Sequence, residues 1–334
     1  MSKKPWDGLN ILLGALLALW LLAGCASSGD TGRAAKESCG SPRALPSPDG
    51  SKIILARPAG RFCAIYTVAD DGSDIHGVPA PGTNASRMTP SYSPDGRQIA
   101  FTQTADGDRT HIHVMNADGT DIRQVTHSEH ADTYPAFSPD GSQIVFARAH
   151  RHRTDFLART PWVDVDVYVV SLDGTGEQRL TQESFYDMSP PYFSPDGTDI
   201  LFAASPASAN SPNRRVYRVD VKSRTLHALT DGSSFDFDPV FSPDGSTIAF
   251  MSSRGQDRSV PGGYEVWTMD RTGANARELT HARQFFMLPY YFPDGRSLLV
   301  VKELPDNVHH EIWRMDADGK NLRRIAGPEV LSGP

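Results

Sequence analysis

The chain has 334 residues, of which 39% are hydrophobic and 22% are charged. This composition excludes a disordered or fibrous protein, because such chains are poorer in apolar residues or strongly biased toward a few residue types. Acidic residues outnumber basic residues by 40 to 33, and the formal net charge is −7. A nucleic-acid-binding protein needs a basic surface, so the charge argues against a nucleic-acid partner.

The first 24 residues are predicted to be an export signal that lies outside the fold. Lys3 and Lys4 precede a mostly apolar run of fifteen residues, 10–24. This run is shorter than the roughly 20 residues that cross a hydrocarbon core, and it has the length of a secretory h-region. It ends in the sequence LAGC at residues 22–25, which resembles a bacterial lipobox. The resemblance implies transfer of diacylglyceryl to the Cys25 thiol, cleavage before Cys25 and acylation of the new amine. The alternatives are an ordinary signal peptide that contains a cysteine, or an N-terminal membrane anchor.

A short tether is predicted after the signal. Residues 25–40 are mostly small and polar, as in a flexible linker, and two acyl-type anchors hold a protein firmly at a membrane. By resemblance to lipoproteins of Gram-negative bacteria, Ala26 after the lipidated cysteine implies delivery to the outer membrane, facing the periplasm. We therefore expect an exported, lipid-anchored protein.

Two further cysteines, Cys39 and Cys63, remain in the expected mature chain. Disulfides persist in an oxidising compartment, so these two cysteines can pair. The alternative is that both are unpaired small hydrophobic residues.

A tetrapeptide recurs six times along the rest of the chain. Five copies read Ser-Pro-Asp-Gly and the sixth has Phe in place of Ser; they begin at Ser47, Ser93, Ser138, Ser194, Ser242 and Phe292. Successive Asp residues of the copies are 46, 45, 56, 48 and 50 residues apart. Self-similarity at such a period is typical of solenoids and propellers.

The residues around each tetrapeptide predict a β-hairpin. Pro presets φ for a turn, Asp tolerates the next position, and Gly takes the positive φ that follows. Apolar residues then alternate at fixed offsets after each turn, as Ile53 and Leu55 do in the first copy and Ile99 and Phe101 in the second. Alternation at period two indicates a strand with one face toward a core.

A second hairpin follows in every unit. An aromatic-type residue precedes a second turn, usually Asp-Gly, by five positions; these residues are Tyr66, His113, Tyr168, Tyr217, Trp267 and Trp313. Each unit therefore has four antiparallel strands, which is one propeller blade. We predict an all-β, six-bladed β-propeller over residues 41–334, and no helix pattern appears after residue 25.

The repeat resembles that of the TolB family. The residues that carry the resemblance are a Pro three positions before the Ser-Pro-Asp-Gly turn, the following apolar-x-Phe strand and the aromatic before Asp-Gly, kept in phase over residues 41–334. A propeller presents a rigid rim of loops and a central channel, so we predict a module that binds a protein or peptide of the cell envelope. The alternatives are an accessory or scaffold subunit of an envelope complex and, by the resemblance, association with the Tol–Pal machinery. TolB proteins carry an α/β domain before the propeller and are soluble in the periplasm, whereas here the tether stands in that place.

No motif for enzymatic chemistry accompanies the repeats. The sequence contains no G-x-S-x-G, no G-x-x-x-x-G-K-[ST], no H-E-x-x-H and no C-x-x-C. A similar repeat precedes the α/β-hydrolase domain of prolyl-oligopeptidase-like peptidases, but the six predicted units take up residues 41–334, so we expect no such domain in this sequence. We predict a non-enzymatic protein without a cofactor.

Histidine offers the one alternative. Some propeller polysaccharide lyases resemble this chain in fold and use a metal held by histidines, so a metal-assisted carbohydrate lyase or hydrolase is the competing hypothesis. Its candidate ligands are His127, His130, His150 and His152. His113 replaces an aromatic residue at a packing position, which favours a core histidine.

The third unit carries the candidate binding surface. It is the longest unit, and its extra residues fall between its second and third strands, on the end of the propeller opposite the Pro-Asp-Gly turns. Loop variation on a rigid scaffold is where binding usually resides, and Arg and aromatic residues are favoured in interfaces. The candidates are Arg148, His150, Arg151, His152, Arg153, Phe156, Arg159 and Trp162, which would bind an anionic partner. The alternative is that these arginines pair with Asp132, Asp187 or Asp236.

Overall fold

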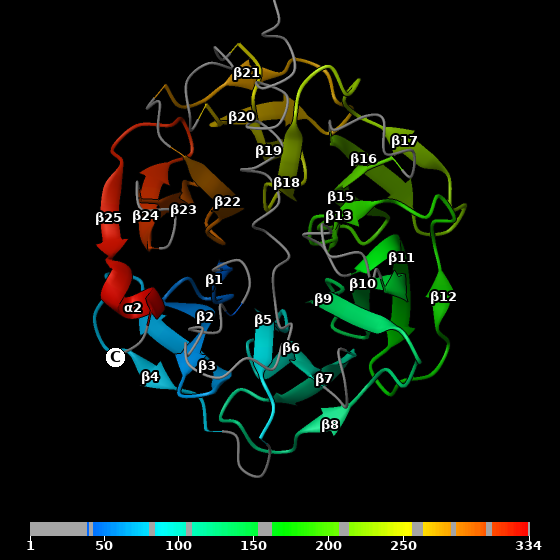
Figure 1. Ribbon diagram of the computed structural model, residues 1–334. Helices are drawn as coiled ribbons and strands as arrows, with labels where there is room; N and C mark the ends of the chain where they lie inside the picture. Colours follow the sequence, from blue (N-terminus) through cyan, green and yellow to red (C-terminus); the bar gives the residue numbers. More distant parts are fainter. Residues whose placement is uncertain are drawn as a thin grey trace, which may run out of the picture.

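A computed structural model describes residue 39 and residues 43–79, 84–104, 109–152, 162–206, 214–255, 263–281, 285–304 and 309–332. Six antiparallel sheets surround a central axis, as Figure 1 shows in a view along that axis. Each sheet consists of consecutive strands, so the predicted six-bladed propeller with four-stranded blades is confirmed.

The strands of the first three blades have the following bounds. Blade 1 comprises β1 (Ala44–Pro46), β2 (Lys52–Ala59), β3 (Phe62–Ala69) and β4 (His76–Gly77). Blade 2 comprises β5 (Arg87–Tyr92), β6 (Gln98–Thr104), β7 (Thr110–Asn116) and β8 (Arg123–Gln124). Blade 3 comprises β9 (Ala131–Phe137), β10 (Gln143–His152), β11 (Trp162–Ser171) and β12 (Gln178–Arg179).

The last three blades complete the ring. Blade 4 comprises β13 (Asp187–Met188), β14 (Tyr192–Phe193), β15 (Asp199–Ser205), β16 (Arg215–Asp220) and β17 (Leu226–Ala228). Blade 5 comprises β18 (Asp236–Phe241), β19 (Thr247–Ser252), β20 (Glu265–Asp270) and β21 (Arg277–Glu278). Blade 6 comprises β22 (Phe286–Tyr291), β23 (Ser297–Glu303), β24 (His310–Asp316) and β25 (Arg323–Ala326). The first strand of each blade faces the axis and the last lies at the rim (Figure 1).

The repeated turn is held by its own side chains. In the first copy, the Ser47 hydroxyl donates to Asp49 Oδ1 at 2.5 Å and accepts a 3.0 Å hydrogen bond from the backbone N–H of Lys52. The same two bonds recur in the other four serine-containing copies, at 2.5–2.6 Å and 2.9–3.0 Å. The serine therefore closes the turn between the first two strands of a blade, which explains its repetition without any catalytic role.

The inner strands are bent by proline. A register shift interrupts the pairing of β5, β9, β18 and β22 with the next strand. In these four strands the residue before the proline has a positive φ of 49–58°; these residues are Thr89, Tyr134, Asp238 and Leu288. In blade 4 two prolines, Pro190 and Pro191, divide the inner strand into β13 and β14. Such bulges change the direction in which a side chain points, and here they bring side chains of different blades together near the axis.

The first and last blades meet without exchanging a strand. A Cβ added to Gly50 would lie 3.6 Å from Cδ of Pro293, and the same Gly-to-Pro contact recurs between every pair of neighbouring blades.

A five-residue helix, α2 (Pro328–Ser332), lies beside blade 1, where Arg57 Nη1 donates to the carbonyl oxygens of Glu329 (3.3 Å) and Val330 (3.1 Å). The prediction of no helix after residue 25 was therefore wrong at this point. Within the described residues, no helix is both long and apolar enough to cross a membrane.

Cys39 and Cys63 are joined in a disulfide, with a Cα–Cα distance of 5.6 Å. Cys63 lies in β3, and both cysteines pack against Met88 of β5 in the neighbouring blade. The disulfide therefore fastens the segment before β1 between blades 1 and 2, at the end of the propeller away from the Pro-Asp-Gly turns.

Candidate functional site

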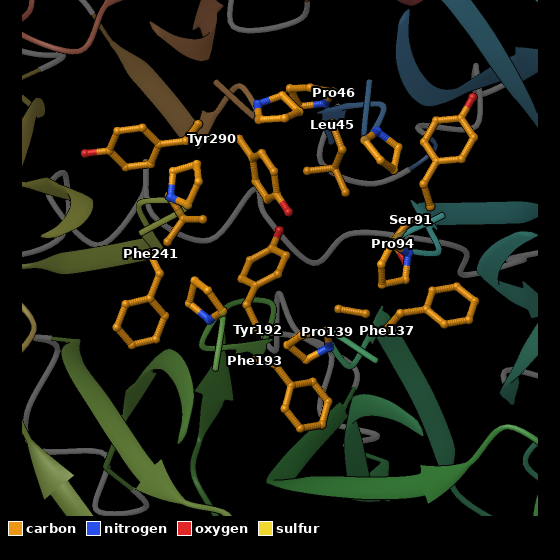
Figure 2. Close-up of a pocket in the computed structure, with 18 of the residues that line it drawn as sticks. Leu45, Pro46, Ser91, Pro94, Phe137, Pro139, Tyr192, Phe193, Phe241 and Tyr290 are labelled. Atoms are coloured by element: carbon orange, nitrogen blue, oxygen red, sulfur yellow. The ribbon is translucent and has the colours of Figure 1, made fainter. Parts of the chain in front are cut away.

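A pocket of about 290 Å³ lies on the propeller axis, at the end that carries the Pro-Asp-Gly turns (Figure 2). Every blade contributes to its wall from the end of its inner strand. The prolines of all six turns line it, together with aromatic residues; these are Tyr92, Phe137, Tyr192, Phe193, Phe241, Tyr290 and Tyr291. Concave sites with mostly apolar walls and a few polar groups are typical of ligand-binding pockets.

Tyr192 and Tyr290 stand at the centre of this pocket. Their rings meet edge to face with centroids 5.6 Å apart. Burial raises the pKa of both hydroxyls, so both remain protonated at neutral pH. Figure 2 shows both residues among the side chains that line the pocket.

Arg43 lies beneath Tyr192. Its Nε and Nη2 donate to Tyr192 Oη at 3.2 and 2.8 Å, and its guanidinium carbon lies 5.1 Å from the centroid of the Tyr192 ring. Only 2% of Arg43 is exposed, and its Nη1 has no hydrogen-bond partner. A buried cationic donor without a partner is uncommon in native proteins, so this nitrogen calls for an explanation.

A second group of buried charges lies near Arg43. Arg214 is fully buried and donates from Nη2 to Asp187 Oδ2 at 2.7 Å. Asp238 accepts a 3.3 Å hydrogen bond from the backbone N–H of Leu288. Burial raises the pKa of Asp238 to about 6, although the charges of Arg214 and Arg43 oppose the shift. These residues come from blades 1, 4, 5 and 6, so the cluster exists only when the ring is closed.

The candidate surface over blade 3 is arranged differently from the sequence-based expectation. β10 extends to His152, so Arg148 lies within a strand and is 5% exposed. Its Nε donates to Asp132 Oδ1 at 2.6 Å, and its Nη1 donates to Glu177 Oε1 at 2.5 Å. Arg148 thus follows the alternative, pairing with Asp132, and the expectation that it presents a free charge to a partner was wrong. The physical reason is strand alternation, which places Arg148 on the same buried face as Phe146.

The remaining residues of that surface are only partly described. Arg151 is exposed and pairs with Asp164, with 2.8 Å between Nε and Oδ2. His152 and Trp162 are described only as backbone at the ends of their strands, and three candidates lie outside the described residues; these are Arg153, Phe156 and Arg159. Docking over blade 3 therefore stays a prediction that Arg148 does not support.

Asp187 and Asp236 do not pair with the arginines of blade 3. Asp187 pairs with Arg214, and Asp236 accepts from Arg254 Nη2 at 3.0 Å. Asp132, Asp187 and Asp236 begin or nearly begin the inner strands of three successive blades. Each of these buried carboxylates pairs with an arginine, and the same kind of pair is therefore repeated in three blades.

The histidines do not form a metal centre among the described side chains. No group of three or more potential ligands that could hold a metal ion occurs there, and the His152 side chain is not among them. The rings of His130 and His150 meet edge to face, with centroids 4.9 Å apart, and His127 is exposed. The Tyr168 hydroxyl lies 3.2 Å from His150 Nε2, and burial lowers the pKa of His150.

His113 packs as the repeat predicts. It stacks on Phe101 with centroids 5.7 Å apart, as Tyr168 stacks on Phe146 at 5.7 Å. Burial lowers its pKa to about 4, so it is neutral at physiological pH.

The sequence reasoning missed the axial cluster. Tyr192 and Tyr290 lie four residues before the Asp of their turns, where the other blades carry Leu45, Ser91, Ala136 and Val240. Aligning the six repeats column by column would have shown two tyrosines at an otherwise small or aliphatic position. The same alignment would have placed Arg43 and Asp238 together at the position two residues earlier.

Comparison with known proteins agrees with this architecture. The Protein TolB homolog of Chlorobium luteolum is 30% identical over 172 residues, which cover 52% of this chain and 35% of that protein. The match to the uncharacterized peptidase YuxL of Bacillus subtilis covers 17% of that peptidase. The chain therefore matches only part of the length of these relatives.

Two solved structures show the same fold. TolB from Acinetobacter baumannii superposes with a TM-score of 0.63 at 20% identity, covering 82% of this chain and 63% of that one. An oligogalacturonate lyase in complex with manganese superposes with a TM-score of 0.61 at 14% identity, covering 85% and 76%. At these identities the likeness concerns the fold alone. The family model described as TolB beta propeller domain matches residues 47–155 and 166–331, and the chain therefore belongs to the TolB β-propeller domain family.

Proposed function

We propose that this protein is a non-enzymatic binding module of the bacterial cell envelope, which holds a protein or peptide in its axial pocket. The observation that carries the proposal is the pocket itself, because all six blades contribute aromatic and proline side chains to one concave surface. Peptide-binding grooves lined by aromatic side chains are a recurrent mode of recognition.

The proposal includes an anchor at the membrane. Residues 1–24 would be removed, Cys25 would carry lipid, and residues 25–40 would tether the propeller of residues 41–334 to the outer membrane, facing the periplasm. Cys25 and its neighbours lie outside the described residues. The disulfide supports this arrangement, because it fixes the end of the tether at the side of the propeller opposite the pocket. The pocket would then be free to meet a partner.

Co-purification from solubilised membranes tests the proposal. The wild-type protein should retain a partner that is identified by mass spectrometry. Tyr92→Ala combined with Phe193→Ala, which removes two partly exposed aromatic walls of the pocket, should reduce that capture at least tenfold. Arg151→Ser, an exposed change at the opposite end, serves as the control and should leave capture unchanged. Equal capture by the pocket variant and the wild type would overturn the proposal.

A metal-assisted carbohydrate lyase or hydrolase is the second candidate. The observation that favours it is the close approach of His130 and His150 at the end opposite the axial pocket. It predicts that the purified, tag-free protein retains manganese or zinc after dialysis and cleaves an anionic oligosaccharide. Unchanged oligosaccharide together with no retained metal would dispose of this candidate.

A further inference from the structure

The wall of the axial pocket carries no charged side chain. It consists of proline, serine, aromatic and aliphatic residues. Among the buried groups near the axis, Arg43 and Arg214 are balanced at neutral pH by Asp187 and Asp238. An ionised side chain loses its hydration in such a cavity at a high cost, whereas an apolar side chain gains free energy by leaving water. The pocket therefore suits an apolar side chain.

The mouth of this pocket is ringed by carboxylates. A proline from each of the six repeated turns lines the pocket, and the next residue is always an exposed aspartate; the six are Asp49, Asp95, Asp140, Asp196, Asp244 and Asp294. In four of the turns, the hydrogen bond from the serine hydroxyl lowers the pKa of the aspartate. These carboxylates are therefore ionised at neutral pH and face solvent around the opening.

Most of these charges lack a cationic partner within the protein. Asp196 pairs with Arg271 at 2.7 Å, and Asp95 lies 3.9 Å from the exposed Arg97. Lysine or arginine follows the Asp within three residues in only three of the six turns, so carboxylates outnumber cationic side chains there. Among the residues that the structure describes, four of the six aspartates make no ion pair; these are Asp49, Asp140, Asp244 and Asp294.

The negative charge of the mouth acts on the pocket wall. Tyr92 and Tyr291 line the pocket. Burial raises the pKa of both hydroxyls to about 12, and a carboxylate of the neighbouring blade adds to the shift, Asp49 for Tyr92 and Asp244 for Tyr291. The apolar pocket and the acidic mouth are therefore parts of one site.

We propose that the axial pocket binds a segment of a partner protein in which an apolar residue is flanked by lysine or arginine. The apolar side chain fills the pocket, and the flanking cations lie against the aspartates of the mouth. Because the aspartates surround the opening, basic residues on both sides of the apolar residue meet a carboxylate. Exposed ion pairs contribute little affinity each, so the ring acts mainly on selectivity. This inference rests on the proposed binding function and adds the kind of sequence that the pocket selects.

Three peptide libraries test the inference on the full-length protein in detergent. All are acetylated pentapeptide amides with Leu, Phe or Trp at the centre and Ala at both ends. The residues that flank the centre are Lys in the first library, Gln in the second and Glu in the third. At 0.15 M salt, capture of the Lys library should exceed capture of the Gln library at least fivefold, and the Glu library should be captured least.

The salt concentration separates the two parts of the site without any substitution. Between 0.15 M and 1 M salt, the Debye length falls from about 8 Å to about 3 Å. The preference for Lys over Gln should therefore disappear at 1 M salt, while capture of the Gln library through its apolar residue remains.

Aspartate variants locate the charge. Asp49→Asn combined with Asp244→Asn removes two charges of the mouth and keeps an oxygen that accepts from the turn serine. This variant should lose most of the preference for Lys. Asp118→Asn combined with Asp173→Asn is the matched control, because these exposed aspartates accept similar turn hydrogen bonds from threonines. They lie between the third and fourth strands of their blades, about 10 Å further from the axis, so the control should keep the preference.

Equal capture of the Lys and Gln libraries, or a preference for Lys that survives 1 M salt, would overturn the inference. A preference that is unchanged in the folded Asp49→Asn, Asp244→Asn variant would overturn it as well, and the salt series on the wild type decides if this variant does not fold. Equal capture that is lost in the Tyr92→Ala, Phe193→Ala variant would leave the proposed function standing. Capture of none of the libraries would also overturn the inference, and the co-purification would then decide the proposed function separately.

Discussion

Arg43 and Tyr192 are 149 residues apart in the sequence and are joined at the propeller axis by hydrogen bonds of 3.2 and 2.8 Å. They belong to blades 1 and 4, which are opposite in a ring of six. This contact therefore links opposite sides of the ring through Tyr192, which lines the pocket, and Arg43, which is buried.

Removing the Tyr192 hydroxyl should destabilise the protein. Tyr192→Phe leaves two more buried donors of Arg43 unpaired, and an unsatisfied buried polar group costs about 1–3 kcal/mol. Urea unfolding should show a decrease of this size in the free energy of unfolding. Tyr291→Phe removes the same atom from a pocket-lining tyrosine for which no hydroxyl hydrogen bond is described, and it should be nearly neutral. Equal effects of the two substitutions would show that the contact between Arg43 and Tyr192 does not stabilise the ring.

Asp238→Asn should change how stability depends on pH. Burial raises the pKa of Asp238 from 3.8 to about 6, so between these values the folded state holds a proton that the unfolded state releases. The free energy of unfolding therefore falls as pH rises through this window. Above pH 6 the charged Asp238 should destabilise the folded protein by about 3 kcal/mol, at 1.36 kcal/mol per pKa unit.

The expected result is that Asp238→Asn is more stable than the wild type at pH 8 and loses this advantage near pH 4. Asp95→Asn is the contrast, because the hydrogen bond from Ser93 lowers the pKa of Asp95 and gives a stability contribution that is lost as pH falls. Chemical denaturation at a series of pH values measures both. An Asp238→Asn protein that is less stable than the wild type at pH 8 speaks against a destabilising buried charge.

The disulfide should contribute to the stability of the first blade. Cys39 and Cys63 are 24 residues apart, and a loop of this size corresponds to about 3 kcal/mol in the chain-entropy estimate. The Cys39→Ser, Cys63→Ser double variant should melt earlier than the oxidised wild type. Hydrogen exchange should show the loss beginning in β1 and β3. Two free thiols in the native, oxidised protein would refute the bond.

Arg148 should behave as a structural residue. Removing one partner of a buried ion pair costs about 3–5 kcal/mol, because the other charge is left buried and alone. Arg148→Ala leaves the buried Asp132 carboxylate without its arginine, so urea unfolding should show a large decrease in the free energy of unfolding. Arg151→Ala breaks an ion pair in which the arginine is 67% exposed, for which about 1 kcal/mol or less is expected. A neutral Arg148→Ala would return this residue to the candidates for surface binding.

Lipidation of Cys25 is tested by fractionation and mass spectrometry. The wild-type protein should occur in the membrane fraction with an acylated N-terminal cysteine. Cys25→Ser should leave the precursor uncleaved by the lipoprotein signal peptidase. Wild-type mature protein that is soluble in the periplasm and lacks acyl mass is the contrary result.

The architecture could be predicted from the sequence because the signal is repeated. Six turns of one type, all with the Pro-Asp-Gly sequence and five of them with the serine, determine the number of blades independently of any single residue. The helix α2 was not predicted, since five residues are too few to show a helical period. The burial of Arg148 was missed because the charged run from Arg148 to Arg153 resembles a loop, although the first part of it continues the alternation of β10.

The candidate site could not be predicted in the same way. Arg43, Tyr192, Tyr290 and Asp238 lie in four different blades, and their proximity depends on closure of the ring. Each of them alone reads as an ordinary strand residue. Only the column alignment of the repeats carries a trace of the site, and the chemistry appears when the bulged inner strands bring these side chains to the axis.

Site-specific photo-crosslinking in living cells tests most directly whether the axial pocket is the binding site. A benzoylphenylalanine is introduced at Phe193, in the pocket, or at Arg151, at the opposite end, and the crosslinked products are identified by mass spectrometry. The account predicts a discrete crosslinked envelope protein or peptide from position 193 and none from position 151. Crosslinks from position 151 alone would contradict it and would place the binding surface over blade 3.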